Sequence, residues 1–414
     1  MIKTNKNISK ESGEHLNPFP GLRPYYAEDS HLFFGRDREI DEVKEDLINK
    51  GFVLITGSSG IGKSSLIYSG ILPALVSDKK WRFLITRPGD DPVENICRDF
   101  FSDTLSDNEI IGLKRNESKL KDHFISYIRK SDKKYLFVID QFEEVFFTKS
   151  IRYQKEFISE RNIYLKFIVD LANESELPVY FIISMRSDFI VDSLAFTELT
   201  SLFRDSNYLL SGISEENVRK IIEEPLKNKG VSIEERLTEK LIKDFRERDK
   251  YTLPVFQYSL MRIWNYWRGH GNPEKIMNLG DYEAIGGLDK ALSNHANEIF
   301  EGLSIKQKVI CEKLFRSITS KDDDNRSINR PTSVKKLSEI IQVKPDEIIE
   351  VVRKFLSDEV CILRTFDKNT LGEDSMIELT HETIMQLWDR LRDWVEVEYE
   401  SVRMYKKLSA AASG

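Results

Sequence analysis

The chain has 414 residues, a formal net charge of −7 and a hydrophobic content of 40%. This length exceeds one ordinary core and indicates several domains, since a domain typically holds about 100–200 residues. The negative charge argues against a broad nucleic-acid-binding surface. No apolar run approaches the roughly 18 residues of a membrane span, and no apolar targeting segment follows the polar start. We therefore expect a cytoplasmic chain without membrane contact.

The first half of the chain alternates between strand-like and helix-like stretches. Residues 1–16 read as a polar tail, and residues 36–50 have the apolar spacing of a helix. Apolar strands that alternate with helices predict an α/β fold with a parallel sheet covered by helices on both faces. The runs that predict these strands are FVLIT, WRFLITRP, YLFVIDQFEEVF, VYFIISMRSDF and NYLLSGIS.

A glycine-rich stretch, GSSGIGKSS, follows the first predicted strand and matches the pattern G-x-x-x-x-G-K-[ST]. Glycines let backbone N–H groups turn towards phosphates without a Cβ clash, and the N-terminus of the next helix adds partial positive charge. Lys63 would reach the β- and γ-phosphates, and the Ser64 hydroxyl would ligate Mg²⁺. We expect the helix to end near Leu72, before Pro73. The predicted phosphate site comprises Gly57, Ser58, Ser59, Gly60, Ile61, Gly62, Lys63, Ser64 and Ser65.

Charged residues end two of the other predicted strands, at the sheet edge that also carries the glycine-rich loop. Asp140 would hold the Mg²⁺ shell, and either Glu143 or Glu144, with Glu144 favoured, would activate the attacking water. Alternatively, the two glutamates face solvent at a helix start. Arg186 would contact the γ-phosphate and sense its loss, or else pair with Asp188.

The second half is mainly helical and closes with a mixed segment. From about Leu303 it predicts helices at 303–318, 332–342 and 345–357, followed by the strands CILRTF and SMIELT. Three helices with a hairpin are the outline of a winged helix. A final amphipathic stretch follows. The cysteines Cys97, Cys311 and Cys361 lack metal-ligand spacing, so we expect buried, reduced thiols.

With these motifs in view, the chain resembles the Novel STAND NTPase 1 family, a bacterial branch of the signal-transducing STAND class of P-loop NTPases, from about Asn17 onward. The resemblance implies a P-loop sheet followed by an α-helical domain and a winged-helix domain. It rests on NPFPGLRPYYAEDSHLFFGRDREI, GSSGIGKSSLIYSGILPAL, FVIDQFEEVF, SMRSDF, LPVFQYSLMRIW, YEAIGGLDKAL and LTHETIMQLWDRLRDW.

The resemblance also implies contacts and a mode of action that spacing does not show. Phe34, Gly35 and Arg36 would lie by the adenine, Pro254 would close over the base, and His381 would approach the phosphates of ADP. Read from the residues alone, a lone histidine after a strand is more often structural. The chain would be a slow Mg²⁺-dependent ATPase, using ATP/ADP as a switch for homo-oligomer assembly in bacterial antiviral defence or signalling, in response to an unknown trigger.

The resemblance further implies an effector module and a repeat sensor, so we expect the native chain to continue beyond Gly414. Two alternatives remain open: a DNA-binding regulator that uses the basic stretch Arg326–Lys336, and a scaffold that holds ADP permanently. The third predicted helix of the winged helix is rich in acidic residues, which argues against contact with DNA. The predicted domains are a tail at 1–16, a P-loop nucleotide-binding domain at 17–212, a helical domain at 213–298, a winged helix at 299–400 and the start of a further segment at 401–414.

Overall fold

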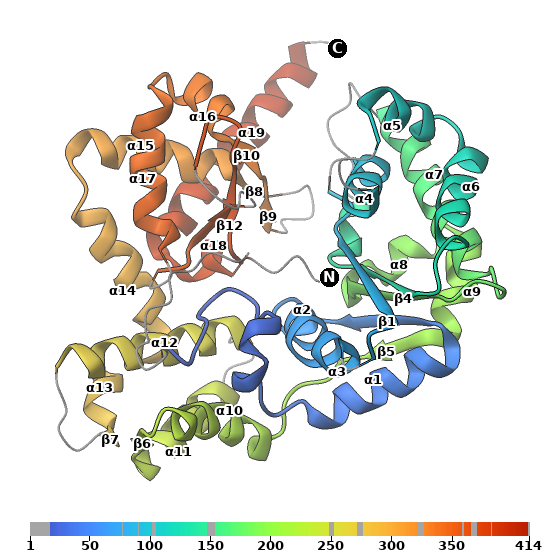
Figure 1. Ribbon diagram of the computed structural model, residues 1–414. Coiled ribbons are helices and arrows are strands. Elements are labelled where there is room, and N and C mark those ends of the chain that lie inside the picture. The colour runs from blue at the N-terminus through green and yellow to red at the C-terminus, as the bar shows by residue number, and fades with distance from the viewer. Residues whose placement is uncertain are drawn as a thin grey trace. The chain divides into compact units, whose positions relative to one another are not determined.

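The structure is a computed structural model (Figure 1). The predicted tail at 1–16 and Arg326 of the basic stretch lie outside its described residues. The chain divides into two compact units: unit 1 holds Tyr25–Asn217, and unit 2 holds the chain from Val218 together with 17–24. The four boundaries between the five predicted segments stay a prediction. The described residues are 17–76, 78–89, 91–101, 105–146, 154–247, 252–270, 276–321, 327–357, 360–365, 371–381 and 383–412.

Unit 1 is built on a five-stranded sheet in the order β2-β3-β4-β1-β5. Every pair of neighbouring strands is parallel, which confirms the predicted α/β sheet. The register sets Gly57 at the end of β1 opposite Arg186 at the end of β4. The charged ends of the strands therefore meet at one edge. The strands are β1 (Phe52–Gly57), β2 (Trp81–Thr86), β3 (Lys134–Ile139), β4 (Val179–Arg186) and β5 (Asn207–Leu209).

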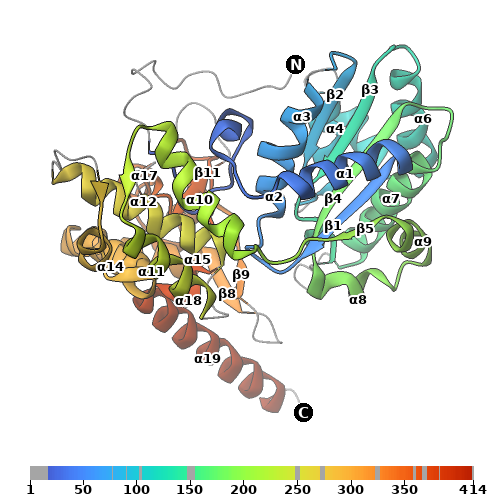
Figure 2. The ribbon, with the colours of Figure 1, turned by 90° about the horizontal axis from the view of Figure 1, so that it is seen from below.

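Helices cover both faces of this sheet, because the side chains of each strand alternate between the faces. On β3, Phe137 packs in one core cluster and Val138 in the other. Figures 1 and 2 show α1 on one side of the sheet and α6 and α7 on the other. The helices are α1 (Asp37–Lys50), α4 (Pro92–Phe101), α5 (Asp107–Lys114), α6 (Glu117–Ile128), α7 (Gln154–Ala172), α8 (Ile190–Ser193) and α9 (Thr197–Ser206), with the short turns η1 (Ala27–Leu32), η4 (Phe142–Phe146) and η6 (Ser187–Phe189).

The helix after the glycine-rich loop differs from the prediction, because it continues through Pro73. It consists of α2 (Lys63–Ser65), the π-helical turn η2 (Leu66–Ile71) and α3 (Leu72–Val76). A proline in a regular helix clashes with the carbonyl four residues earlier. In the wider π turn the Leu72 N–H instead bonds to the Ile67 carbonyl, five residues back. This different spacing lets the helix pass through the proline.

Unit 2 begins with helices and ends with a mixed segment. The helices α12 and α14 pack against each other, and the three-stranded sheet β10-β12-β11 is antiparallel. The predicted helices and strands form, whereas the assignment of this segment as a winged helix stays a prediction. The elements are α10 (Glu215–Asn228), β6 (Ser232–Ile233), α11 (Glu235–Arg246), α12 (Leu253–Gly269), β7 (Ile276–Met277), α13 (Leu279–Ala284), α14 (Gly287–Glu301), α15 (Ile305–Ile318), β8 (Thr319–Lys321), β9 (Ser327–Asn329), β10 (Thr332–Ser333), α16 (Val334–Ile341), α17 (Pro345–Leu356), β11 (Leu363–Thr365), β12 (Met376–Leu379), α18 (Ile384–Leu387) and α19 (Asp389–Ala412).

The segment 17–24 packs within unit 2, although it precedes unit 1 in the chain. The Asn17 side-chain amide donates to the Met261 carbonyl at 3.1 Å and to the Asn265 side chain at 2.9 Å, both on α12. Gly21 has φ +71, and a Cβ there would lie 2.7 Å from the Met261 sulfur. Only a glycine fits this approach without a shift, so the segment is fitted closely to α12.

All three cysteines are free and buried, which confirms the expectation from their spacing. Burial raises the pKa of the Cys97 thiol to about 12. Within the described part of the chain, no helix is both long and apolar enough to span a membrane.

Replacing Phe181 by alanine should lower the free energy of unfolding of unit 1 by about 3–5 kcal/mol, because it opens a cavity in the centre of the sheet. The Phe181 ring is fully buried and lies 5.0 Å from the Phe137 ring between centroids. Urea unfolding measures the change. The control Val191→Ala, at a position that is 74% exposed, should stay within about 0.5 kcal/mol. Equal effects of the two substitutions would contradict this core.

Candidate nucleotide-binding site

The glycine-rich loop forms a compact turn between β1 and α2. Gly60 and Gly62 take left-handed backbone angles, with φ of 73° and 99°. The Lys63 ammonium folds back over the loop and donates to the carbonyls of Gly57 at 2.9 Å and Ser58 at 3.0 Å. Burial lowers the pKa of Lys63, and the charges of Glu143 and Asp140 oppose this effect. A partly buried ammonium that donates to backbone carbonyls at this loop is suited to bind an anion that enters the loop.

Of the three residues predicted to lie by the adenine, Arg36 contacts this loop. Gly35 is left-handed, with φ 79°, and the side chain of Arg36 that follows is buried. The Arg36 guanidinium donates to the Ile61 carbonyl at 3.2 Å and to the Ser211 carbonyl at 3.0 Å. Arg36 therefore joins the loop to the chain after β5. Phe34, which precedes Gly35, is partly buried. The contact of these residues with adenine stays a prediction.

Asp140 is the most extensively bonded side chain of the site. It is fully buried and follows β3. Its Oδ1 accepts hydrogen bonds from the Ser64 hydroxyl at 2.9 Å and the Ser184 hydroxyl at 2.5 Å. Its Oδ2 accepts from the Tyr68 hydroxyl at 2.8 Å and from Arg87 at 3.4 Å. Burial raises the pKa of Asp140, but the Arg87 charge and these hydrogen bonds outweigh burial, so the pKa lies below its ordinary value.

The structure gives the two glutamates different surroundings. Gln141 has φ 57°, a left-handed angle that is uncommon for a residue other than glycine, and it turns the chain from β3 into η4. Glu143 is 7% exposed, and its Oε2 accepts from the Arg186 backbone N–H at 3.2 Å. Glu144 instead accepts from the Gly89 N–H at 2.9 Å. Glu143 thus shares the surroundings of Lys63, whereas Glu144 holds the loop after β2.

Burial raises the pKa of Glu143 to about 7, and the nearby Lys63 charge opposes this effect. A carboxyl group with this pKa is close to half ionised at neutral pH. General bases work best when their pKa lies near the operating pH. Glu143 and Glu144 therefore differ in their surroundings, and the choice between them as the group that activates water stays a prediction.

Arg186 lies at the predicted edge of the sheet and takes the alternative of the two predicted contacts. Its Nε and Nη2 donate to the two carboxylate oxygens of Asp188 at 3.1 Å and 2.7 Å. Its guanidinium carbon lies 5.3 Å from the centroid of the Phe189 ring. A role of Arg186 in sensing the γ-phosphate stays a prediction.

Pro254 and His381 belong to unit 2, so their predicted nucleotide contacts also stay predictions. Pro254 occupies the first turn of α12, where a proline costs no hydrogen bond. The His381 Nδ1 accepts from the Thr383 backbone N–H at 3.2 Å and lies 2.9 Å from the Thr383 hydroxyl. These bonds fix the ring within its own turn.

Sequence reasoning missed three side chains that bind Asp140, namely Tyr68, Arg87 and Ser184. Ser184 is a small polar residue inside an otherwise apolar strand, which is a weak signal of a buried hydrogen bond. Tyr68 and Arg87 carry no local signal, because their contacts depend on how η2 and β2 pack around β3. Only the strand order places them beside the carboxylate.

The donors present fit a magnesium nucleotide. Ser64 and Asp140 offer oxygen atoms, which Mg²⁺ prefers, and Mg²⁺ usually takes one or two protein groups together with phosphates and waters. The described residues contain no group of three or more His, Cys, Asp or Glu side chains that could hold a metal by themselves.

The parallel sheet, the glycine-rich loop with its lysine, and the carboxylate beside it define the class of P-loop NTPases. The sequence matches the Novel STAND NTPase 1 family over residues 18–414. The chain belongs to this family, which supports a nucleotide-dependent NTPase that works as a switch. A comparison with curated proteins found no significant match.

Solved structures show a distant likeness. Cdc6p of Pyrobaculum aerophilum is 13% identical, and the match covers 88% of this chain and 94% of that chain with a TM-score of 0.45. ORC1 of Aeropyrum pernix, in complex with DNA, is 14% identical over 91% and 94%, with a TM-score of 0.44. The RuvB branch migration motor of Thermotoga maritima is 13% identical over 88% and 97%, with a TM-score of 0.38.

Glu143→Gln should stabilise the protein at alkaline pH. A carboxyl group whose pKa is about 7 when folded, against an ordinary 4.5, contributes its full stability below pH 4.5 and loses it as the pH rises to 7. The neutral amide avoids this loss. The free energy of unfolding of the variant should therefore exceed that of the wild type by about 2–3 kcal/mol at pH 8 and by under about 1 kcal/mol at pH 5. Urea unfolding at both pH values measures it, and an equal gain at both would contradict the assignment.

Proposed function

We propose that this chain binds Mg²⁺ with ATP or ADP in unit 1 and hydrolyses ATP slowly, as a cytoplasmic switch in bacterial defence or signalling. The observation that carries the proposal is the buried Asp140 joined to Ser64, with Lys63 and Glu143 at the same edge of the sheet. Side chains that suit the phosphates, the metal and the attacking water thus come together at one loop.

Binding of the phosphates would use charges that the structure now pairs internally. The Lys63 ammonium would exchange its bonds to the Gly57 and Ser58 carbonyls for phosphate oxygens. The glycine loop would present its N–H groups, and the start of α2 would add positive charge. Ser64 and Asp140 would hold Mg²⁺, which when bound neutralises phosphate charge.

Hydrolysis would form a bond between a water oxygen and the γ-phosphorus and break the bond from that phosphorus to the bridging oxygen of ADP. Glu143 would accept the proton of the water, and the Arg186 N–H fixes the Glu143 Oε2. Glu144 would act indirectly, through the loop that it holds at Gly89. Arg186 would sense the γ-phosphate if it exchanged Asp188 for a phosphate oxygen.

The switch would arise from contacts of the nucleotide that differ between two arrangements of the chain. A ligand shifts such an equilibrium only by its difference in affinity for the two states. Pro254 and His381 of unit 2 are our candidates for contacts made with ADP and lost with ATP. The ATP-bound state would assemble into a homo-oligomer after an unknown trigger acts.

Lys63→Ala should abolish measurable binding of ATP and ADP, because it removes the cation from the phosphate loop. Isothermal titration calorimetry measures both affinities. The matched control Lys50→Ala removes a lysine that is exposed on α1 and pairs with Asp46, and it should bind as the wild type does. Unchanged affinity for ATP and ADP in Lys63→Ala would contradict the proposed nucleotide site.

Glu143→Gln should lower single-turnover ATP hydrolysis by about 10²–10⁴-fold, the usual contribution of a general base. Glu144→Gln, the matched control on the same turn, should cost much less because its carboxylate bonds to the Gly89 backbone. Release of labelled phosphate measures both rates. A larger loss in Glu144→Gln would reverse the assignment, and a wild type that releases no phosphate would favour the scaffold that holds ADP.

A further inference from the structure

A cation from the end of the neighbouring strand contacts the buried carboxylate of the site. Arg87 follows β2, and its Nη2 lies 3.4 Å from the Asp140 Oδ2. The Asp140 side chain is completely buried, whereas the Arg87 side chain is 20% exposed. A buried carboxylate is costly unless a cation and hydrogen bonds compensate it. Arg87 supplies that charge without any metal.

The four contacts of Asp140 are divided between its two oxygens. Oδ1 receives the hydroxyls of Ser64 and Ser184, and Ser64 is the residue expected to ligate Mg²⁺. Oδ2 receives Tyr68 and Arg87. Because the last torsion of an aspartate is broad and nearly twofold, contacts on one oxygen decide where the other points. The pair on Oδ2 thus keeps Oδ1 at Ser64.

The backbone around Arg87 is itself held in place. The Asp140 N–H donates to the Thr86 carbonyl at 3.0 Å, which continues the β2–β3 ladder to the edge of the sheet. One residue after Pro88, the Gly89 N–H donates to Glu144 at 2.9 Å. The Asn95 side chain donates to the Pro88 carbonyl at 2.8 Å. The segment that carries Arg87 is therefore fixed on both sides.

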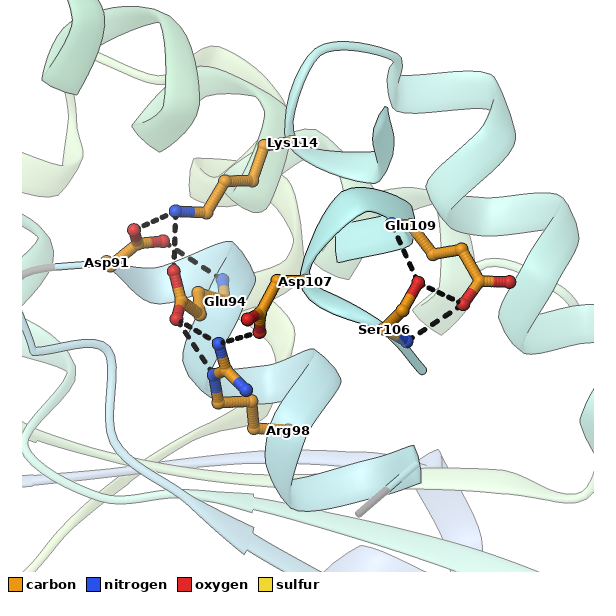
Figure 3. Close-up of polar contacts among 7 residues, drawn as sticks. All are labelled: Asp91, Glu94, Arg98, Ser106, Asp107, Glu109 and Lys114. Carbon is orange, nitrogen blue, oxygen red and sulfur yellow. Dashed lines mark hydrogen bonds and ion pairs between the residues drawn. The ribbon is translucent and has the colours of Figure 1, made fainter. Parts of the chain in front are cut away.

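Ion pairs at the start of α4 continue this support (Figure 3). Lys114 at the end of α5 contacts Asp91 and Glu94. Figure 3 also shows Arg98, one turn further along α4, between Glu94 and Asp107. Arg98 carries the same charge as Arg87, but its side chain is 49% exposed and it pairs with Glu94 and Asp107 rather than with Asp140.

We propose that Arg87 is a positioning residue that, together with Tyr68, holds Asp140 in the orientation that serves the Mg²⁺ of the bound nucleotide. The inference rests on the proposed function, because it concerns how that nucleotide gains affinity from the metal. Arg87 acts through Asp140. It compensates the charge of the carboxylate before the metal arrives and keeps Oδ1 directed at Ser64.

The test compares the affinity for ADP in Mg²⁺ and in EDTA, measured by calorimetry on the full chain. The ratio of the affinity in Mg²⁺ to the affinity in EDTA is the gain in ADP affinity that the metal provides, and it is called the gain below. Arg87→Gln should reduce this gain by about tenfold, since partners that orient a metal ligand typically affect metal affinity by about 10–100-fold. Its affinity for ADP in EDTA should stay within about twofold of the wild type. The control Arg98→Gln should leave both values unchanged.

Two further variants separate charge from shape. Arg87→Lys should keep most of the gain, because the observed contact uses a single nitrogen rather than a bidentate fork. Tyr68→Phe removes the other donor to Oδ2 but keeps the ring that stacks on Tyr26. Tyr68→Phe should also lower the gain in ADP affinity that Mg²⁺ provides. If Arg87→Gln does not fold, Tyr68→Phe serves as the test of the inference.

Each other outcome is decisive. An unchanged gain in Arg87→Gln, or in Tyr68→Phe where that variant replaces it, overturns the inference. Parallel losses in Mg²⁺ and EDTA also overturn it, since they show a structural role only. A larger gain in Arg87→Gln would mean that Arg87 competes with the metal, which is the opposite of positioning. A wild type that fails to bind ADP in either condition would refute the proposed function instead.

Discussion

The buried charge of Asp140 is the constraint on which the rest of unit 1 depends. An ionised carboxylate inside a protein must be compensated by several donors at once, and removing one leaves the charge unpaired. Here the donors come from the helix after the loop, from β4 and from the end of β2. The order of the strands, their register and the path of the first helix are all needed to bring those donors to one carboxylate. Folding and site assembly are thus the same event in this unit.

The strands and the phosphate loop could be predicted because their signals are local. A buried strand shows as a short apolar run, and GSSGIGKSS carries its own geometry in its glycines. The parallel sheet followed from the alternation of such runs with helices. The course of the helix through Pro73 could not be predicted, because no local pattern in LIYSGILP signals the π turn that precedes the proline.

The candidate site was predictable only in part, for the same reason. Lys63, Ser64 and Asp140 belong to patterns that sequence displays. Which of the neighbouring glutamates lies by Lys63 depends on the left-handed turn at Gln141, which no local rule assigns to a glutamine. Arg87 reads in sequence as one more exposed arginine, and only the pairing of β2 with β3 gives it a partner. Residues that support other residues leave weak signals, since their contacts are distant in the chain.

The buried cysteines give each unit a chemical probe of its own opening. Cys97, on the buried face of α4, lies in the core of unit 1, and Cys311 and Cys361 lie in unit 2. Only a thiolate reacts readily with an alkylating reagent. The folded core keeps the reagent away from Cys97, and burial also raises the pKa of this thiol to about 12, so that little thiolate forms. Labelling at one of these sulfurs would then require that unit to loosen. Mass spectrometry of the labelled peptides could follow the two units separately, with no engineered cysteine, through a cycle of nucleotide exchange.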